Sequence, residues 1–190
     1  MSLNATTNSE QARLDLSSVS YPVMEHFYTL QGEGMYTGQA AYFIRLGGCD
    51  VGCVWCDVKD SWDVNAHPLM TVKEIVAAAK AHPGRIAVIT GGEPAMHNLE
   101  ALTHELKAAG FRTHLETSGS SQLSGNLDFI TLSPKKFKAP IPEALACADE
   151  LKVIVFHKSD FDFALEQAAN VSEDCVLFLQ PEWSKAEQMT

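Results

Sequence analysis

The alternation of short apolar runs with amphipathic stretches restricts the fold of this 190-residue chain more than any other feature. Runs rich in β-branched and aromatic residues predict strands at 23–30, 40–47, 85–92, 111–119, 127–135, 149–156 and 176–182. Apolar residues at helical spacing predict helices at 71–82, 97–110 and 159–169. Strands that alternate with helices form mostly parallel sheets. Because so few helices cannot complete an eight-fold barrel, we expect an α/β fold, a partial (incomplete) TIM-type barrel with mostly parallel strands and few helices.

Residues at the ends of these helices support their predicted limits. Thr71, with Glu74 three positions later, is a capping-box pattern at the start of the first helix. Gly110 ends the second helix as a C-terminal cap. Ser159 and Asp160 mark the start of the third helix.

Four predicted strands end in glycine or polar residues. The segments are TGGEP (90–94), LETSG (115–119), LSPK (132–135) and LQPE (179–182). In α/β sheets and barrels, ligands bind at the carboxyl ends of the strands. The sequence therefore predicts a binding site on the rim at which these four ends meet.

The balance of charge and the lack of long apolar runs argue against two classes of protein. With 24 acidic against 14 basic residues the net charge is −10, which is unlike a nucleic-acid-binding surface. No apolar run approaches the roughly 20 residues of a membrane helix. The polar N-terminus lacks the apolar segment of a secretory signal. We therefore expect a cytoplasmic protein with a disordered lead-in at 1–20 and a single domain at 21–190.

Three of the five cysteines, Cys49, Cys53 and Cys56, follow the pattern C-x3-C-x2-C. Disulfides are rare in a reducing compartment, so this cluster indicates chemistry rather than structural crosslinking. Cys147 and Cys175 stand alone in the sequence, and we expect each to be a small buried apolar residue.

Three chemistries use a cysteine group of this kind. A structural zinc site is four-coordinate and would take its fourth ligand from His26, His67 or His97, whereas a catalytic zinc would keep that position open. The CVWC segment (53–56) also matches a C-x-x-C redox pair, although a third cysteine upstream is foreign to a thioredoxin-type motif. Thiolates also hold iron–sulfur clusters, usually one per iron, so three cysteines leave one iron of a cubane open.

An amine and a carboxylate can chelate such an open iron, and the methionine end of S-adenosylmethionine (SAM) offers both. An electron from the cluster would then cleave a C–S bond and release a carbon radical, with the cofactors carrying the hard chemistry. C-x3-C-x2-C with the aromatic Trp55 before the last cysteine resembles the radical SAM superfamily, as does the strand end GGEP (91–94). This resemblance implies a 4Fe–4S cluster on the three cysteines, SAM as cofactor, and Trp55 beside the adenine.

Further motifs narrow the resemblance to one family. TLQGEG (29–34), FIRLGGC (43–49) and the four strand ends are similar to the 7-carboxy-7-deazaguanine synthase family, from about Pro22 to Trp183. The resemblance implies a lyase of queuosine biosynthesis that contracts 6-carboxy-5,6,7,8-tetrahydropterin to 7-carboxy-7-deazaguanine with loss of ammonia. It also implies that SAM is regenerated, that a protein such as flavodoxin donates the electron, and that the enzyme is a homodimer.

The resemblance also assigns roles to the matching residues. The implied substrate-binding residues are Leu30, Gln31, Gly32, Glu33, Arg45, Thr90 and Glu116. The implied SAM-binding residues are Trp55, Gly92, Glu93, Ser133, Pro134, Lys135, Gln180 and Trp183. An arginine within an apolar strand is costly to bury unpaired, so Arg45 requires a carboxylate partner, either in the substrate or within the protein.

Two features depart from the family pattern. The family follows its last cysteine with Asp-Thr, and that threonine ligates magnesium, whereas here Asp57 precedes Val58, which cannot coordinate a cation. Magnesium is therefore a doubtful cofactor, and we expect turnover to depend little on it. The family also continues with a helix and a strand that carry a histidine near the substrate, whereas this sequence ends at SKAEQMT (184–190). We expect those elements to lie beyond the sequence shown.

Two other functions stay open at this stage. A small glycyl-radical-enzyme activating protein shares the cysteine pattern, but it acts on a partner protein and has no need of QGEG (31–34) or Arg45. A zinc-binding interaction module would contain zinc without iron or sulfide.

Overall fold

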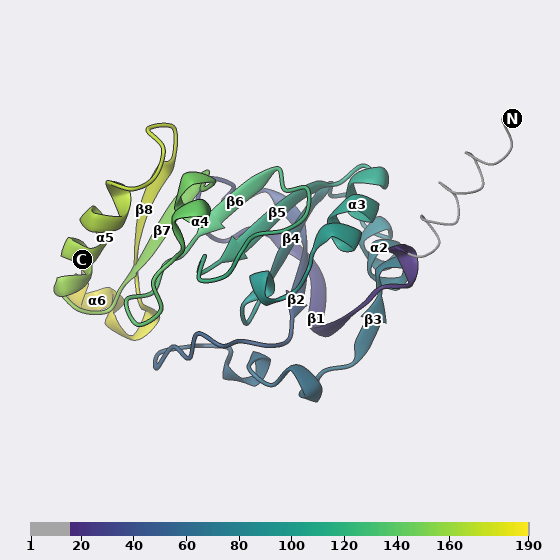
Figure 1. Ribbon diagram of the computed structural model, residues 1–190, viewed down its shortest axis with the longest axis horizontal. Helices are drawn as coiled ribbons and strands as arrows, with labels where there is room; N and C mark the ends of the chain where they lie inside the picture. Colours follow the sequence, from purple (N-terminus) through teal and green to yellow (C-terminus); the bar gives the residue numbers. More distant parts are fainter. Residues whose placement is uncertain (1–15, 190) are drawn as a thin grey trace, which may run out of the picture.

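The structure is a computed structural model, and it describes residues 16–189 (Figure 1). These residues form an eight-stranded sheet with the strand order β3-β1-β2-β4-β5-β6-β7-β8. Because β3 and β8 lie at its two edges, the sheet is open, and the predicted partial barrel is confirmed. The strands are β1 (Ser20–Leu30), β2 (Ala40–Leu46), β3 (Leu69–Thr71), β4 (Ile86–Gly91), β5 (Arg112–Thr117), β6 (Phe129–Leu132), β7 (Glu150–Val155) and β8 (Val176–Pro181).

The strand directions bring the predicted ligand-binding ends together. β1 is antiparallel to both β2 and β3, whereas every neighbouring pair from β2 to β8 is parallel. The carboxyl ends of the parallel strands therefore meet at one edge of the sheet. The segment between β2 and β3, residues 47–68, runs along this edge (Figure 1).

Three helices confirm the predicted ones, namely α2 (Val72–Lys80), α3 (Glu100–Ala108) and α5 (Ser159–Ala168). The capping box of α2 is present, since the Glu74 N–H donates to the Thr71 hydroxyl and the Thr71 N–H donates to the Glu74 carboxylate. At the start of α5, the Asp160 carboxylate accepts hydrogen bonds from two preceding backbone N–H groups. Thr71 therefore caps α2 as predicted, whereas the N-cap of α5 is Lys158, which makes no side-chain cap, and Asp160 holds the residues just before the helix.

The shortest elements were missed by the sequence analysis, because a few residues carry no readable period. They are β3, α4 (Pro142–Ala146), α6 (Ala186–Met189) and the 3-10 helices η1 (Lys59–Ser61), η2 (Val64–Ala66), η3 (Pro94–Met96) and η4 (Trp183–Lys185). None of the described helices combines the length and the apolar character that crossing a membrane requires.

Alternate strand residues face opposite sides of the sheet, which separates the main core from the polar face. On one side Ile44, Ile89 and Leu115 pack with Leu102 and Leu106 of α3, and all five are fully buried. Each such side chain contributes about 1.5–3 kcal/mol through burial. A second apolar cluster joins β6 and β7 to α4 and α5. The helices thus cover one face, and the opposite face is left for a site.

Two further expectations can be compared with the structure. Cys175 is buried as predicted, but the prediction for Cys147 was wrong, because this residue caps the end of α4 and is exposed. The predicted lead-in at 1–20 lies mostly outside the described residues. Within its last part, residues 16–18 form a helical turn, and Leu16 packs against the core.

Candidate active site

A cavity of about 840 Å³ lies at the carboxyl edge of the sheet. Its lining comes from strand residues of β2 and β4–β8, from the cysteine segment, and from the residues after β1. All predicted site residues line it except Leu30, which is exposed at the end of β1, and Pro134, which is buried. The fold therefore gathers residues from most of the chain into one space.

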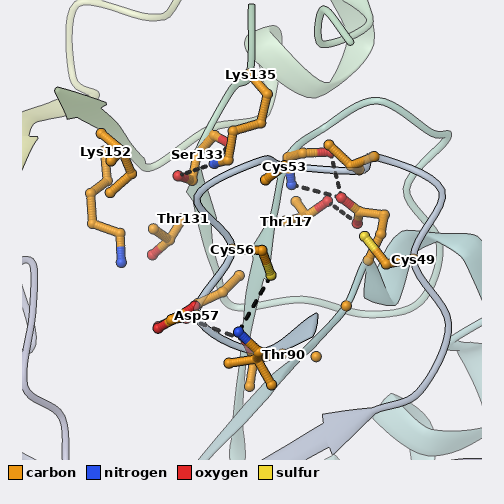
Figure 2. Close-up of a pocket in the computed structure, with 18 of the residues that line it drawn as sticks. Cys49, Cys53, Cys56, Asp57, Thr90, Thr117, Thr131, Ser133, Lys135 and Lys152 are labelled. Carbon is orange, nitrogen blue, oxygen red and sulfur yellow. Dashed lines mark hydrogen bonds between the residues drawn. The ribbon is translucent and has the colours of Figure 1, made fainter. Parts of the chain in front are cut away.

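Cys49, Cys53 and Cys56 all line this cavity (Figure 2). Cys53 is buried, and the other two are partly exposed. The loop is fixed at its start, where the Gly48 N–H donates to the Ser61 carbonyl at 2.7 Å. The φ of Gly48 is +101°, a conformation that glycine adopts readily. The three thiols are soft ligands of the kind that bind iron–sulfur clusters or zinc.

Half-buried Lys135 lies beside these thiols. Its ammonium group donates to the Ser133 carbonyl at 2.5 Å and hydroxyl at 2.7 Å, and it lies 5.5 Å from the centre of the Trp55 ring. Burial lowers the pKa of Lys135 to about 8. Burial raises the pKa of the Cys53 thiol, and the charge of Lys135 opposes that rise. A cation at this position offsets part of the negative charge that three thiolates bring into the cavity.

Trp62 and three histidines distinguish between the metal groups considered. The indole N–H of Trp62, a residue of the cavity lining, is buried and has no hydrogen-bond partner within residues 16–189, so the wall carries a donor that a bound group can use. Among the described residues, no group of three or more His, Cys, Asp or Glu side chains could hold a single metal ion. Each histidine considered as a fourth zinc ligand has another partner: His26 the Tyr42 hydroxyl, His67 the Asp60 carbonyl and His97 the Gly47 carbonyl. The lining therefore fits a cluster better than a closed zinc site.

The glycine pair at the end of β4 allows this strand to touch the cysteine loop. A Cβ on Gly92 would lie 2.4 Å from the Gly48 carbonyl oxygen and 2.6 Å from the Cβ of Cys49. A Cβ on Gly91 would lie 2.2 Å from the Leu46 carbonyl oxygen, and the φ of Gly91 is +150°. Both positions therefore require glycine. The close approach keeps the backbone of Gly92 on the cavity wall.

The carboxylate of Glu93 connects the end of β4 to the end of β5 through hydrogen bonds. Glu93 is 1% exposed, and its carboxylate accepts hydrogen bonds from the N–H groups of Ala95 and Ser118 and from the hydroxyls of Thr117 and Ser118, at 2.5–3.0 Å. Four donors match the acceptor capacity of one carboxylate. The structure thus shows a bridging role for Glu93, and its contact with SAM stays a prediction.

β1 is antiparallel to β2, so β1 ends beside the start of β2, at the end of the sheet away from the cysteines. The segment after β1 lines the cavity from that side. The Gln31 amide donates to the Glu116 carboxylate of β5 at 2.9 Å. Glu33 accepts hydrogen bonds from Lys152 of β7 and Gln180 of β8, each at 2.6 Å. Gln31 and Glu116, both predicted to contact substrate, therefore already contact each other, whereas Glu33 pairs with Gln180, assigned to SAM, and with Lys152, which was not predicted.

Arg45 has a carboxylate partner within the protein. Its Nε donates to Glu25 of β1 at 2.7 Å, which is one of the two alternatives that the sequence left open. The side chain is 19% exposed and also lines the cavity. Thr90 stands beside Arg45 in the register of β2 and β4, and its hydroxyl donates to Glu116 at 3.4 Å.

Val58 also lines the cavity and presents a hydrocarbon side chain to it. Its N–H donates to the Cys56 sulfur at 3.4 Å, and its carbonyl accepts the hydroxyl of buried Ser61 at 2.6 Å. Asp57, the preceding residue, contributes a carboxylate to the same lining (Figure 2). Trp183 is 91% exposed, so most of its ring faces solvent.

Several lining residues were missed by the sequence analysis. They include Trp62, Thr117, Ser118, Thr131 and Lys152. Lys152 had a usable signal, since it lies inside the apolar run LKVIV (151–155), and a lysine in a buried strand requires a partner. Thr117 and Ser118 belong to the polar strand end LETSG (115–119), but nothing marked either as a site residue by itself, because Ser and Thr are common at strand ends and turns.

Comparisons with known proteins agree with this geometry. The radical SAM superfamily matches residues 43–134. The 7-carboxy-7-deazaguanine synthase of Flavobacterium psychrophilum is 54% identical over 169 residues, which cover 89% of this chain and 80% of the relative. The protein of the same name from Synechocystis sp. is 50% identical over 169 residues, covering 89% of this chain and 81% of the relative.

A solved structure supports the same assignment. The crystal structure of QueE from Escherichia coli matches with a TM-score of 0.82 at 33% sequence identity, and the match covers 93% of this chain and 90% of that one. The described fold and the cysteine-lined cavity thus agree with both sequence and structure comparisons. The chain belongs to the 7-carboxy-7-deazaguanine synthase family of the radical SAM superfamily.

Proposed function

We propose that this chain is a radical SAM lyase that contracts 6-carboxy-5,6,7,8-tetrahydropterin to 7-carboxy-7-deazaguanine with loss of ammonia, in queuosine biosynthesis. The observation that carries the proposal is that Cys49, Cys53 and Cys56 line one cavity together with the polar ends of β4–β8. The names of the relatives support the same reaction. They do not favour the alternatives of a glycyl-radical-enzyme activating protein or a zinc-binding interaction module.

The cofactor side of the cavity is the part near the cysteines. When bound, the 4Fe–4S cluster and SAM supply the one-electron chemistry that removes a hydrogen atom from the substrate. The three cysteines would hold the cluster, and half-buried Lys135 supplies a nearby positive charge. The remaining residues assigned to SAM are Trp55, Gly92, Glu93, Ser133, Pro134, Gln180 and Trp183.

The substrate side lies toward the segment after β1. A flat heterocycle with alternating donors and acceptors needs fixed polar partners of both kinds. The Gln31 amide, the Thr90 hydroxyl and the Glu33 and Glu116 carboxylates line the cavity and hold one another or neighbouring groups in place. The guanidinium of Arg45 has donors beyond the one used on β1, and these suit the substrate carboxylate. Such preorganisation reduces the entropy lost on binding.

Finer properties belong to the same proposal. We infer a cytoplasmic homodimer that takes its electron from a donor such as flavodoxin, with residues 21–190 as a single radical SAM domain. Within residues 16–189 no strand pairs with the outer edge of β8, and the side chains of Leu177 and Leu179 on this strand are exposed; both features support a further packing surface at β8. Val58 supports a small role for magnesium, since its side chain has no oxygen ligand.

Anaerobic turnover tests the proposed function. The reconstituted and reduced protein is mixed with SAM and 6-carboxy-5,6,7,8-tetrahydropterin, and the products are quantified by mass spectrometry. We expect 7-carboxy-7-deazaguanine and ammonia in equal amounts, with SAM regenerated. Cys53→Ala should form no product, whereas Cys175→Ala, a change outside the cavity lining, should keep its turnover. Absence of product from wild-type protein with an intact cluster would refute the proposal.

A further inference from the structure

We propose that Lys152 is a positioning residue that holds the Glu33 carboxylate ionised and correctly placed for substrate recognition. Lys152 lies on β7 and reaches the cavity next to Thr131 and Ser133 of the neighbouring strand region (Figure 2). No sequence motif assigned it a role. The inference rests on the proposed function, because it concerns how the same cavity recognises its substrate.

The contacts of Glu33 come from two different strands. The Lys152 ammonium donates to one carboxylate oxygen at 2.6 Å, and the Gln180 amide of β8 donates to the other at 2.6 Å. The Lys152 side chain is 8% exposed, whereas that of Glu33 is 45% exposed. The lysine is therefore buried behind a carboxylate that remains open to the cavity. A carboxylate has about four acceptor positions, so Glu33 can still accept hydrogen bonds from a bound molecule.

The charges around Lys152 explain why it stays protonated. Burial lowers the pKa of Lys152, but the attraction of Glu116, Glu33 and Glu150 outweighs burial and raises it above the ordinary value. Burial raises the pKa of Glu33, but the charge and hydrogen bond of Lys152 and the hydrogen bond of Gln180 outweigh burial and lower it. The pair is therefore charged on both sides at neutral pH.

A fixed, ionised carboxylate is a strong acceptor for the N–H groups of a pterin-like ring. Without Lys152, Glu33 would keep Gln180 as a donor but would lose its paired cation, in a small pocket that the Glu116 and Glu150 carboxylates also line. Like charges at close range favour protonation of one carboxyl group. A protonated or rotated Glu33 carboxyl group would then accept fewer or weaker hydrogen bonds from the substrate.

Steady-state kinetics of Lys152→Met test this role, because methionine keeps the length and apolar stem of lysine without its charge. We expect kcat/KM for the pterin to fall about 10- to 100-fold, the range of a lost hydrogen bond to a charged group. The binding constant of SAM and the electron paramagnetic resonance (EPR) signal of the cluster with SAM should stay unchanged. Lys107→Met is the matched control, since Lys107 pairs with Asp128 outside the cavity lining.

The pH profile separates positioning from a merely structural role. In Lys152→Met the acid limb of kcat/KM should move to higher pH, since the pKa of Glu33 rises when its cation is removed. Besides Gln180, which donates to Glu33, the titratable groups that line the same small pocket are Tyr36, His114, Glu116 and Glu150, and all are retained in the variant. Lys152→Arg keeps the charge and should keep the acid limb near the wild-type position.

The outcomes distinguish this inference from the proposed function. If the wild type makes no product, the proposed function fails; if it does and Lys152→Met has unchanged kcat/KM and acid limb, only the role of Lys152 fails. Should Lys152→Met not fold by circular dichroism, Gln180→Leu removes the second donor to Glu33 and should move the acid limb in the same direction. An unmoved limb in that variant would overturn the inference as well.

Discussion

The buried imidazole of His114 makes the stability of this fold depend on pH. The residue is 5% exposed, and its ring centre lies 4.5 Å from that of Tyr36 and 5.1 Å from that of Phe129. Its Nε2 is buried without a hydrogen-bond partner within the described residues. Burial, assisted by the charge of Arg112, lowers the pKa of His114 to about 4 from the ordinary 6.5.

The sign and size of the effect follow from linkage. The unfolded chain binds the proton first as pH falls, because its histidine has the higher pKa. The stabilisation is thus complete above pH 6.5 and is lost as pH falls toward the folded value of about 4. Within this window, the free energy of unfolding falls by about 1.4 kcal/mol for each unit by which the pH is lowered. At pH 5 the free energy of unfolding should therefore be about 2 kcal/mol lower than at pH 7 from His114 alone.

Urea unfolding at pH 7 and pH 5 measures this loss. His114→Phe keeps an aromatic ring beside Tyr36 and Phe129 but cannot be protonated, so its loss between the two pH values should be smaller by about 2 kcal/mol. His104→Gln is the control, because the side chain of His104 is 52% exposed. An equal pH-dependent loss in the wild type and His114→Phe would refute the reasoning.

Three further changes give separate tests. Chelating magnesium should change wild-type turnover less than about twofold, whereas the turnover of Val58→Thr should become magnesium-dependent. The absorbance of the cluster is monitored to exclude loss of iron. A steep loss of wild-type turnover that added magnesium restores would contradict this prediction. Gly92→Ala forces apart β4 and the cysteine loop at a cost of about 1–3 kcal/mol, and iron content after reconstitution should drop; unchanged iron content would count against the close approach. Thr71→Ala should lower the free energy of unfolding by about 1 kcal/mol, and an unchanged urea midpoint would speak against the capping box.

Much of the fold could be predicted because its signals are local. Seven of the eight strands and the three longer helices correspond to predicted segments, since apolar spacing and caps are read from neighbouring residues. β3 and α4 were missed because three and five residues show no reliable period. The open sheet followed from the small number of helices.

The site was predictable only where a motif is continuous in sequence. The cysteine loop and the glycines at 91–92 belong to such motifs, and their place on the cavity agrees with the prediction. Partners that lie far apart in sequence were not predictable. Lys152 and Glu33 are separated by 119 positions, and Arg45 and Glu25 by 20, so only the folded register brings each pair together.

Glu93 shows a second limit of sequence reasoning. Its motif pointed to cofactor binding, but the folded chain places four donors from Ala95, Thr117 and Ser118 around its carboxylate. A residue type within a motif does not reveal how many of its acceptor positions the protein itself uses.

The most direct test of the account is the EPR spectrum of the anaerobically reconstituted and reduced protein, recorded with and without SAM. Three thiolates on a cubane would leave one iron open for SAM to reach. We therefore expect a 4Fe–4S signal that changes when SAM is added and disappears in Cys49→Ala, Cys53→Ala and Cys56→Ala. A protein without a cluster signal, or a signal indifferent to SAM, would contradict the central claim.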